Sequence, residues 1–230
     1  MKIVSYYTAD DIYSQHAILL KHSLDHYNLS YSIDSISPRD WLAATAYKPT
    51  FIKAKLAQYQ EALLYIDVDA VVHRNIEPFF RTITEDIAVH YTDDGQLLSG
   101  VIYLQNSPEV MRLVDRWIRK LVEKPNTWDQ MALHEIIDKD ENLSVFKLPP
   151  EYLYIFDTFK KLYPNKQPVI EHLQASREKK YREKCLTPKR RVLHYFGVRP
   201  RVGELLKSRR QRMRELLTEL RTASSHQHVL

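Results

Sequence analysis

The stretch Ala62-Leu63-Leu64-Tyr65-Ile66-Asp67-Val68-Asp69 decides the fold class. Its run of apolar and aromatic residues predicts a short strand that is buried on both faces, as in a sheet covered by helices. The two aspartates follow directly, where the carboxyl end of a parallel strand opens into a ligand-binding crevice. Two carboxylates separated by one residue can bind the same divalent cation together with phosphate oxygens.

Around this strand, short β-rich runs alternate with amphipathic helices, which predicts an α/β domain. Further strands are expected near residues 2–7, 31–36, 87–91, 100–105, 169–170 and 192–196. Helices are expected near 11–26, 50–60, 128–138 and 203–221, with another that begins at Pro108. A proline is tolerated in the first turn of a helix because its missing N–H would have no partner there.

The composition excludes several classes of protein. A chain of 230 residues with 44% hydrophobic and 27% charged residues is globular, so it is neither disordered nor a disulfide framework. With only 4 glycines, it contains neither of the glycine-rich phosphate-binding motifs. The single cysteine, Cys185, fits a reducing compartment, and no apolar run approaches the roughly 20 residues that span a bilayer. We therefore expect a cytoplasmic protein, in the host cytoplasm if the chain is viral.

The net charge of +5 hides a strong asymmetry. Residues 177–221 hold 16 Lys or Arg against 5 Glu, so the remainder of the chain is acidic. A basic segment of this kind is typical of proteins that bind nucleic acid or an anionic membrane surface. A solvated charged helix without a partner is the alternative.

Several motifs follow one another in a fixed order. They are Thr8-Ala9-Asp10-Asp11-Ile12-Tyr13, the segments 51–56, 63–72 and 75–80, the strand Leu98-Ser99-Gly100-Val101, and Trp128-Asp129-Gln130. Together they resemble the GT-A-fold glycosyltransferases that use nucleotide-diphospho-sugars, above all the glycogenin and lipopolysaccharide galactosyltransferase group. The resemblance covers about residues 1–180 and implies a Rossmann-like domain with a mixed central sheet. Residues 181–230 are then a basic helical extension packed on that domain.

The resemblance implies roles for particular residues. Thr8, Asp11 and Tyr13 would hold the nucleobase and ribose of the donor. Asp67 and Asp69 would bind a Mn²⁺ or Mg²⁺ that neutralises the diphosphate leaving group. The donor would be a nucleotide-diphospho-sugar, with a uridine diphosphate sugar favoured.

The resemblance also implies a set of residues around the donor sugar. Lys53 matches a basic position directed at the donor, and Ser99 and Gly100 would lie beside the sugar. Asp129 would hydrogen-bond sugar hydroxyls and Gln130 would lie near the anomeric carbon, so these two are the expected catalytic residues. A helix N-cap is the alternative role for Asp129.

The family usually completes its metal site with a histidine late in the chain. His172, after a short apolar strand, is favoured here, and His194 is the alternative. Arg177, five residues after His172, could clamp a phosphate. A hydrogen-bonded histidine at the end of a strand is the structural explanation for either.

The acceptor is inferred from charge alone. Arg209, Arg210, Arg212 and Arg214 lie on the C-terminal helix, whose Leu206, Met213, Leu217 and Leu220 would pack on the domain. Because fixed arginines can neutralise backbone phosphates, we expect a hydroxymethylated pyrimidine in DNA as the acceptor, as for some bacteriophage enzymes. The alternatives are a cell-envelope glycan at the inner membrane surface, with peripheral membrane contact, and a non-catalytic nucleic-acid-binding protein of the same fold.

Overall fold

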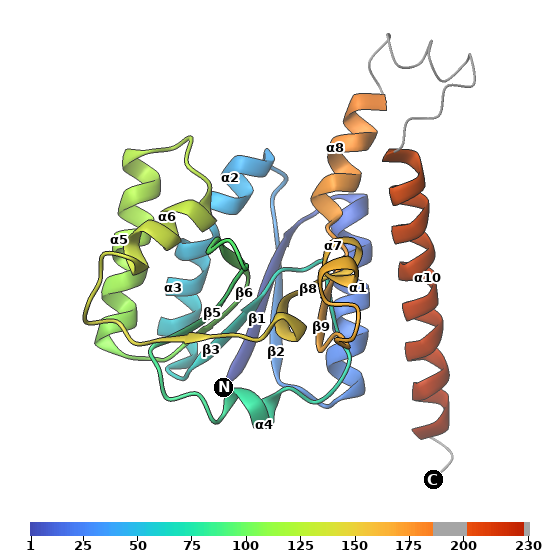
Figure 1. Ribbon diagram of the computed structural model, residues 1–230, viewed down its shortest axis with the longest axis horizontal. Helices are drawn as coiled ribbons and strands as arrows, with labels where there is room; N and C mark the ends of the chain where they lie inside the picture. Colours follow the sequence, from blue (N-terminus) through green and yellow to red (C-terminus); the bar gives the residue numbers. More distant parts are fainter. Residues whose placement is uncertain (186–201, 228–230) are drawn as a thin grey trace.

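The computed structural model describes residues 1–185 and 202–227 and centres on a mixed six-stranded sheet (Figure 1). In spatial order its strands are β2 (Tyr31–Ile36), β1 (Lys2–Thr8), β3 (Leu63–Ile66), β6 (Leu97–Leu104), β5 (Ile87–Tyr91) and β7 (Val145–Lys147). Strand β1 is parallel to both of its neighbours, β2 and β3. Strand β6 is antiparallel to β3 and β5, and β7 is parallel to β5.

One face of this sheet is covered by α3 (Lys48–Tyr59), α5 (Pro108–Glu123) and α6 (Asp129–Ile137), on the left in Figure 1. Helix α5 shows why the sequence folds this way. The Ser107 side chain caps its first turn by accepting a hydrogen bond from Val110 N at 3.2 Å. Its buried side chains recur at helical spacing: Val110, Leu113, Val114, Trp117 and Leu121.

The other face is covered by α1 (Asp11–His26) and by a small three-stranded sheet. Asp10 caps α1 by accepting hydrogen bonds from the Ile12 and Tyr13 amides. The small sheet contains β4 (Ala70–Val72), β9 (Ile170–His172) and β8 (Tyr154–Ile155). The shorter elements are α2 (Trp41–Ala46), α4 (Glu77–Phe80), the 3₁₀ turn η1 (Pro150–Leu153), α7 (Phe156–Leu162) and α8 (Ala175–Cys185).

The two sheets meet at the segment that joins β3 to β4. Asp67 N donates a hydrogen bond to Gly100 O at 2.8 Å, which holds the start of this segment against β6. Strand β9 is antiparallel to β4, with His172 opposite Ala70. A turn near residue 68 is thereby placed beside a strand that lies about a hundred residues later in the chain.

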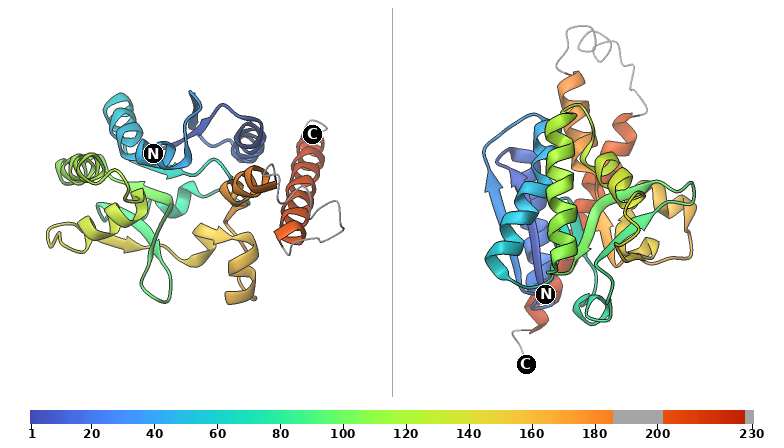
Figure 2. Two further views of the ribbon diagram at one scale, coloured as in Figure 1. Left: turned by 90° about the horizontal axis from the view of Figure 1, so that it is seen from above. Right: turned by 90° about the vertical axis from the view of Figure 1, so that its left-hand side faces the viewer.

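The long helix α10 (Val202–Gln227) lies alongside α1, at the outer edge of the molecule (Figures 1 and 2). Its Leu216 and Leu220 are buried against Leu19 of α1, Val71 of β4 and Leu173 after β9. Met213 and Leu217 are partly buried in the same cluster. The predicted apolar side of the helix therefore packs inward, with Leu216 as an additional and central member; the side chain of Leu206 is outside the described set.

Each strand or helix that was predicted on described residues corresponds to an observed element, although α10 extends to Gln227, beyond the predicted end near 221. The α/β class with a mixed sheet is confirmed. The predicted strand near 192–196 lies outside the described residues. The helices α2, α4, α7 and α8, the 3₁₀ turn η1 and the strands β4, β7 and β8 were not predicted. Most of these segments are too short to carry much periodicity, and α8 consists mainly of polar and charged residues. Among the described residues, no helix combines the length and apolarity that crossing a membrane requires.

Candidate functional site

A cavity of about 270 Å³ lies at the carboxyl ends of β1 and β3. Its size is near the lower end of the roughly 300–1,000 Å³ that is typical of small-molecule sites. The polar residues that line it include Thr8, Lys48, Asp67, Asp69, Ser99, Asp129, Gln130, Gln174 and Ser176. Tyr6, Tyr7, Tyr13, Trp41 and Tyr65 supply aromatic walls. The cavity therefore lies where the sequence analysis expected a site, at the end of β3.

Lys48 is the buried cation of the cavity. It is the first residue of α3, and its Nζ lies 3.0 Å from Asp129 Oδ2 and 3.3 Å from Asp67 Oδ1. It also donates to the backbone oxygen of Ser99 at 3.0 Å. Burial alone would lower the pKa of Lys48, but the charges of Asp129 and Asp67 outweigh it and raise the pKa. The ammonium therefore stays protonated and joins the two carboxylates.

Asp129 and its neighbours form the wall opposite Asp67. Asp129 is the first residue of α6 and uses its carboxylate to accept hydrogen bonds from Lys48 and from Ser99 Oγ, the latter at 3.1 Å. The N-cap position belongs to Trp128, so the alternative role of Asp129 as a cap is not observed. Gln130 Oε1 lies 3.4 Å from Ser99 N. The predicted group Ser99, Asp129 and Gln130 is therefore assembled in one place.

Asp67 and Asp69 differ in their surroundings although one residue separates them. Asp67 Oδ1 accepts a hydrogen bond from Tyr65 Oη at 2.8 Å. Removal from water raises the pKa of Asp67, and the charge of Asp69 adds to this, while Lys48 opposes it. Burial alone would also raise the pKa of Asp69, but its interaction with His172 and the hydrogen bond from Ala175 N at 2.7 Å lower that pKa to about 2.

His172 faces the aspartates from β9. Its Nδ1 lies 3.7 Å from Asp69 Oδ1, and its Nε2 is buried without a hydrogen-bond partner. A Cβ placed on Gly100 would lie 3.3 Å from Asp67 Oδ2 and 3.5 Å from His172 Nδ1. Glycine at this position therefore leaves open the space that these two groups share. His194, the alternative ligand, lies outside the described residues.

The predicted ligands are neighbours but do not yet form a closed metal centre. In the part of the chain that the structure describes, no three His, Cys, Asp or Glu side chains converge as a ready-made metal site. Asp67 shares one carboxylate oxygen with Lys48 and Tyr65, which leaves Oδ2 toward His172. A site of this kind would need the ligands to draw together around a bound cation.

The opening motif supplies another part of the cavity. Thr8 and Tyr13, the residues expected at the nucleoside, line it, and Thr8 Oγ1 donates to Asp10 Oδ2 at 3.1 Å. Asp10 also pairs with Lys179 of α8 at 2.9 Å. Asp11, which we had expected at the donor, is exposed on α1 and does not line the cavity; Asp10 takes the structural role in the motif.

Two other predicted donor residues lie away from the cavity. Lys53 is half-buried on α3 and pairs with Asp115 of α5 at 2.6 Å, whereas Lys48 is the lysine that lines the cavity. Arg177 is exposed on α8, and its Nη1 lies 3.5 Å from Asp157 Oδ2. Its neighbours Gln174 and Ser176 line the cavity instead. Gln174 has a positive φ of 54°, which turns the chain from β9 into α8.

The arginines of α10 do not form the exposed basic face that we predicted. Arg209 is buried and pairs with Asp157. Arg210 pairs with Glu178 at 2.7 Å, and Arg212 binds both oxygens of Glu171, at 3.0 and 3.1 Å. These carboxylates belong to α7, α8 and β9, so the three arginines attach α10 to the rest of the chain.

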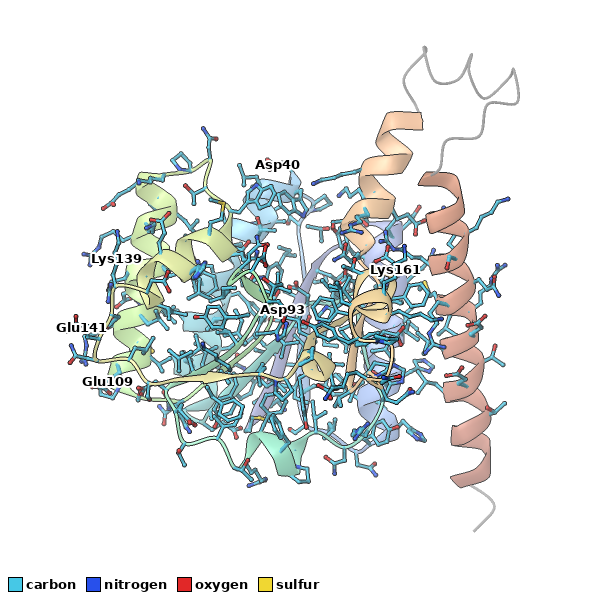
Figure 3. The ribbon with its side chains drawn as sticks, in the orientation of Figure 1. Asp40, Asp93, Glu109, Lys139, Glu141 and Lys161 are labelled. Carbon is cyan, nitrogen blue, oxygen red and sulfur yellow. The ribbon has the colours of Figure 1, made fainter. Side chains whose placement is uncertain are left out.

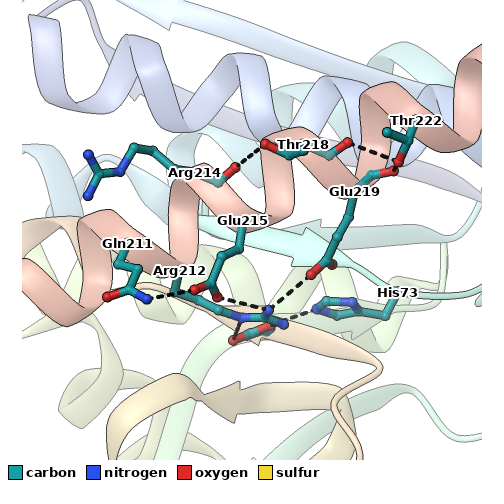
Figure 4. Close-up of polar contacts among 9 residues, drawn as sticks. His73, Gln211, Arg212, Arg214, Glu215, Thr218, Glu219 and Thr222 are labelled. Carbon is teal, nitrogen blue, oxygen red and sulfur yellow. Dashed lines mark hydrogen bonds and ion pairs between the residues drawn. The ribbon is translucent and has the colours of Figure 1, made fainter.

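Glu171 is the most buried carboxylate of this contact, and it also accepts from His73 Nε2 at 2.7 Å. Figure 4 shows Arg212 between His73 and the Glu215 and Glu219 side chains of its own helix. Arg214 points away from this network and is exposed (Figure 4). Two of the four arginines, Arg210 and Arg214, are thus exposed, but Arg210 is held by Glu178.

The fold, the strand-end aspartates and the family profile agree. Residues 8–186 match the sequence profile of a family described as nucleotide-diphospho-sugar transferase. The chain belongs to this family. It is accordingly an enzyme that transfers a sugar from a nucleotide-diphosphate donor, a glycosyltransferase. Comparison with curated protein sequences gives no match.

Solved structures of glycosyltransferases share this fold. A glycosyltransferase involved in the glycosylation of the major capsid of PBCV-1 is 14% identical with a TM-score of 0.61, over 80% of this chain and 98% of that one. The galactosyltransferase LgtC, solved with donor and acceptor sugar analogues, is 11% identical with a TM-score of 0.50, over 75% and 86%. GlyE of Streptococcus pneumoniae TIGR4 is 16% identical with a TM-score of 0.50, over 74% of this chain and 53% of GlyE.

Proposed function

We propose that the cavity at the end of β3 binds a nucleotide-diphospho-sugar together with a divalent cation and transfers the sugar to a hydroxyl acceptor. The excess of negative charge in the cavity is the observation that carries this proposal. Asp67, Asp69 and Asp129 line it, and Lys48 is their one buried lysine partner among the described residues. A diphosphate cannot enter such a site unless a cation accompanies it.

The residues present fit a divalent cation. Asp67, Asp69 and His172 would hold it, because carboxylate oxygens suit Mn²⁺ and Mg²⁺ and an imidazole nitrogen suits Mn²⁺. The open space in front of Asp67 Oδ2 and His172 Nδ1, kept free by Gly100, supports this assignment. The cation would neutralise the diphosphate as the sugar leaves.

The remaining side chains would orient the donor. Tyr65 and Lys48 fix the carboxylate of Asp67 by binding its Oδ1. Lys48 also holds Asp129 beside Ser99, where the Asp129 carboxylate and Ser99 Oγ would accept hydrogen bonds from sugar hydroxyls. Because Asp129 is bound to Lys48, it acts as a positioning and hydrogen-bonding group. Thr8 and Tyr13 would hold the nucleoside, with uridine diphosphate as the expected carrier.

Thermal-shift measurements test donor and metal together. We expect one of a panel of uridine and guanosine diphosphate sugars to raise the melting temperature in Mn²⁺ but not in excess chelator. Asp69→Asn should lose this rise, because it removes a charged ligand. Asp115→Asn, the same substitution on the half-buried pair with Lys53, serves as the control and should keep this rise. An equal rise without any divalent cation would refute the metal-dependent mechanism.

The arrangement of α10 bears on the acceptor. The expectation of hydroxymethylated DNA depended on four exposed arginines, and three of these are paired within the chain. The envelope alternative required the apolar side of α10 to enter a membrane surface, yet Leu216 and Leu220 are buried inside the protein. We therefore propose an acceptor that is recognised at the cavity itself.

Release of free sugar from the donor in Mn²⁺ would distinguish this enzyme from the non-catalytic alternative.

A further inference from the structure

Two tryptophans lie together at the mouth of the cavity. Trp41, the first residue of α2, lines the cavity, and Trp128 precedes α6 with 47% of its surface exposed. Their rings meet edge to face, with centroids 5.5 Å apart and planes at 88°. The third tryptophan of the chain, Trp117, is fully buried. Removing a tryptophan ring from water is energetically favourable, and this free energy is not gained while the ring stays exposed. An exposed tryptophan beside a ligand site is therefore a candidate contact for a ligand.

Both rings are held by rigid parts of the fold. Trp128 is followed by Asp129, whose carboxylate binds Lys48 and whose backbone oxygen accepts from Trp117 Nε1 at 2.9 Å. Helix α2 is capped by Asp40, seen above the sheet in Figure 3, whose side chain accepts a hydrogen bond from Ala43 N at 2.8 Å. The oxygen of Ala44 in the same helix accepts from Tyr6 Oη at 2.6 Å. The pair is therefore a preformed surface rather than part of a freely moving loop.

The two rings are not equally available. The ammonium of Lys180 lies 4.3 Å from the centre of the Trp41 ring and so covers one of its faces. Trp128 is the more exposed ring, and Met131, 51% exposed one turn later in α6, extends its apolar surface. A flat partner would consequently stack on Trp128, with Trp41 supporting that ring from the side.

We propose that Trp128, supported by Trp41, stacks on a sugar ring of a carbohydrate acceptor. This rests on the proposed function, because it places the acceptor next to Asp129 and Gln130, where the donor sugar would lie. A pyranose has an apolar face of C–H groups and a rim of hydroxyls, which suits an aromatic ring next to polar side chains. A nucleobase of DNA could stack as well, but its phosphates need free cations, and three of the four α10 arginines that we had assigned to them are paired.

Intrinsic fluorescence tests this subsite without requiring catalysis. The probes are neutral trisaccharides of glucose, galactose, mannose and N-acetylglucosamine, added to the full chain with Mn²⁺ and uridine diphosphate. We expect at least one to change the tryptophan emission, because two of the three tryptophans lie at the site. Trp128→Ala should weaken that binding about tenfold, the loss of one stacking contact, while Trp128→Phe keeps most of it. Leu162→Ala, an exposed apolar residue of α7, is the matched control.

A second measurement separates the subsite from the proposed function. Slow release of sugar from the donor to water reports donor chemistry alone, and Trp128→Ala should leave it within about twofold while raising KM for the trisaccharide about tenfold. Loss of donor hydrolysis or donor binding in Trp128→Ala would mean that the ring contacts the donor and would overturn the proposal. So would failure of every trisaccharide to bind an enzyme that hydrolyses donor, or transfer to hydroxymethylated duplex DNA in preference to them. If no donor is hydrolysed but a trisaccharide binds through Trp128, the subsite stands and the proposed reaction fails.

Discussion

The cavity at the end of β3 and the contact between α10 and the body both contain buried ion pairs, but their charges are balanced differently. Lys48 faces a cavity wall with Asp67, Asp69 and Asp129, whereas each of three arginines on α10 has its own carboxylate. An unbalanced set of charges draws in a ligand of opposite charge, and a balanced set holds two parts of a chain together. The number of charged residues in a segment does not reveal which of the two it forms.

The largest expected effect lies in the cavity. Lys48→Met should lower the free energy of unfolding by about 3–5 kcal/mol, because it leaves the buried carboxylate of Asp129 without its cation. Lys53→Met, which breaks the solvent-accessible, half-buried pair with Asp115, should cost less than about 1 kcal/mol. Urea denaturation of both variants measures the difference, and similar losses would show that the burial of Lys48 has no energetic consequence.

On α10, the position to be tested and its control position are two residues apart. Arg212→Gln should cost about 2 kcal/mol, because it removes two charge-assisted hydrogen bonds to the buried Glu171. Arg214→Gln, on the exposed side of the same helix, should change stability by no more than about 0.5 kcal/mol. Thermal unfolding and limited proteolysis of α10 measure both; equal resistance of the two variants would contradict the paired arrangement.

The open space in front of Gly100 lies beside the side chains of Asp67 and His172. Gly100→Ala places a methyl group 3.1 Å from His172 Cε1 and should weaken Mn²⁺ binding about tenfold by pressing on the groups that would hold the ion. Gly95→Ala is the control: its Cβ meets nothing, and its positive φ of 82° should cost about 1 kcal/mol of stability without affecting Mn²⁺. Electron paramagnetic resonance of free Mn²⁺ gives both affinities.

The smallest effect concerns the salt dependence of any DNA binding. Each phosphate contact adds about −0.9 to the slope of log affinity against log salt, so four free arginines would contribute about four times that value. Because Arg209, Arg210 and Arg212 are paired, we expect substitution of all four by glutamine to flatten the slope by no more than Arg214→Gln alone. A change in this slope several times larger would support the DNA interface on α10.

The sequence predicted the fold because its buried strands and helical faces repeat with clear periods, and it predicted Asp67 and Asp69 because they end such a strand. It missed Lys48 for a geometric reason. A helix that leads into a parallel strand runs back along the sheet, so only its first turn lies at the strand's carboxyl end. Lys53 is five residues further along α3, about 7.5 Å down the helix axis at 1.5 Å per residue. The available signal was that Lys48 lies just before the helix predicted near 50–60 and is the lysine nearest to its start.

The arginines of α10 illustrate what periodicity cannot supply. Their partners, Asp157, Glu178 and Glu171, come from three different elements, and only the folded chain brings them beside one helix. The apolar spacing of α10 correctly indicated that the helix packs inward, yet it could not show that the arginines on its flanks also face the body. A long-range pairing of charges leaves no local pattern.

The antiparallel pairing of β4 with β9 has a consequence for how the enzyme is made. Asp69 and Ala175, whose backbone N–H binds it, are 106 positions apart in the chain, and Glu171 receives Arg212 still later. During synthesis from the amino end, the aspartates emerge well before the histidine, and Leu19, Val71 and Leu173 lack their α10 partners until that helix has left the ribosome. Completion of the site and closure of this apolar surface therefore both wait for residues that are synthesised long after Asp67 and Asp69.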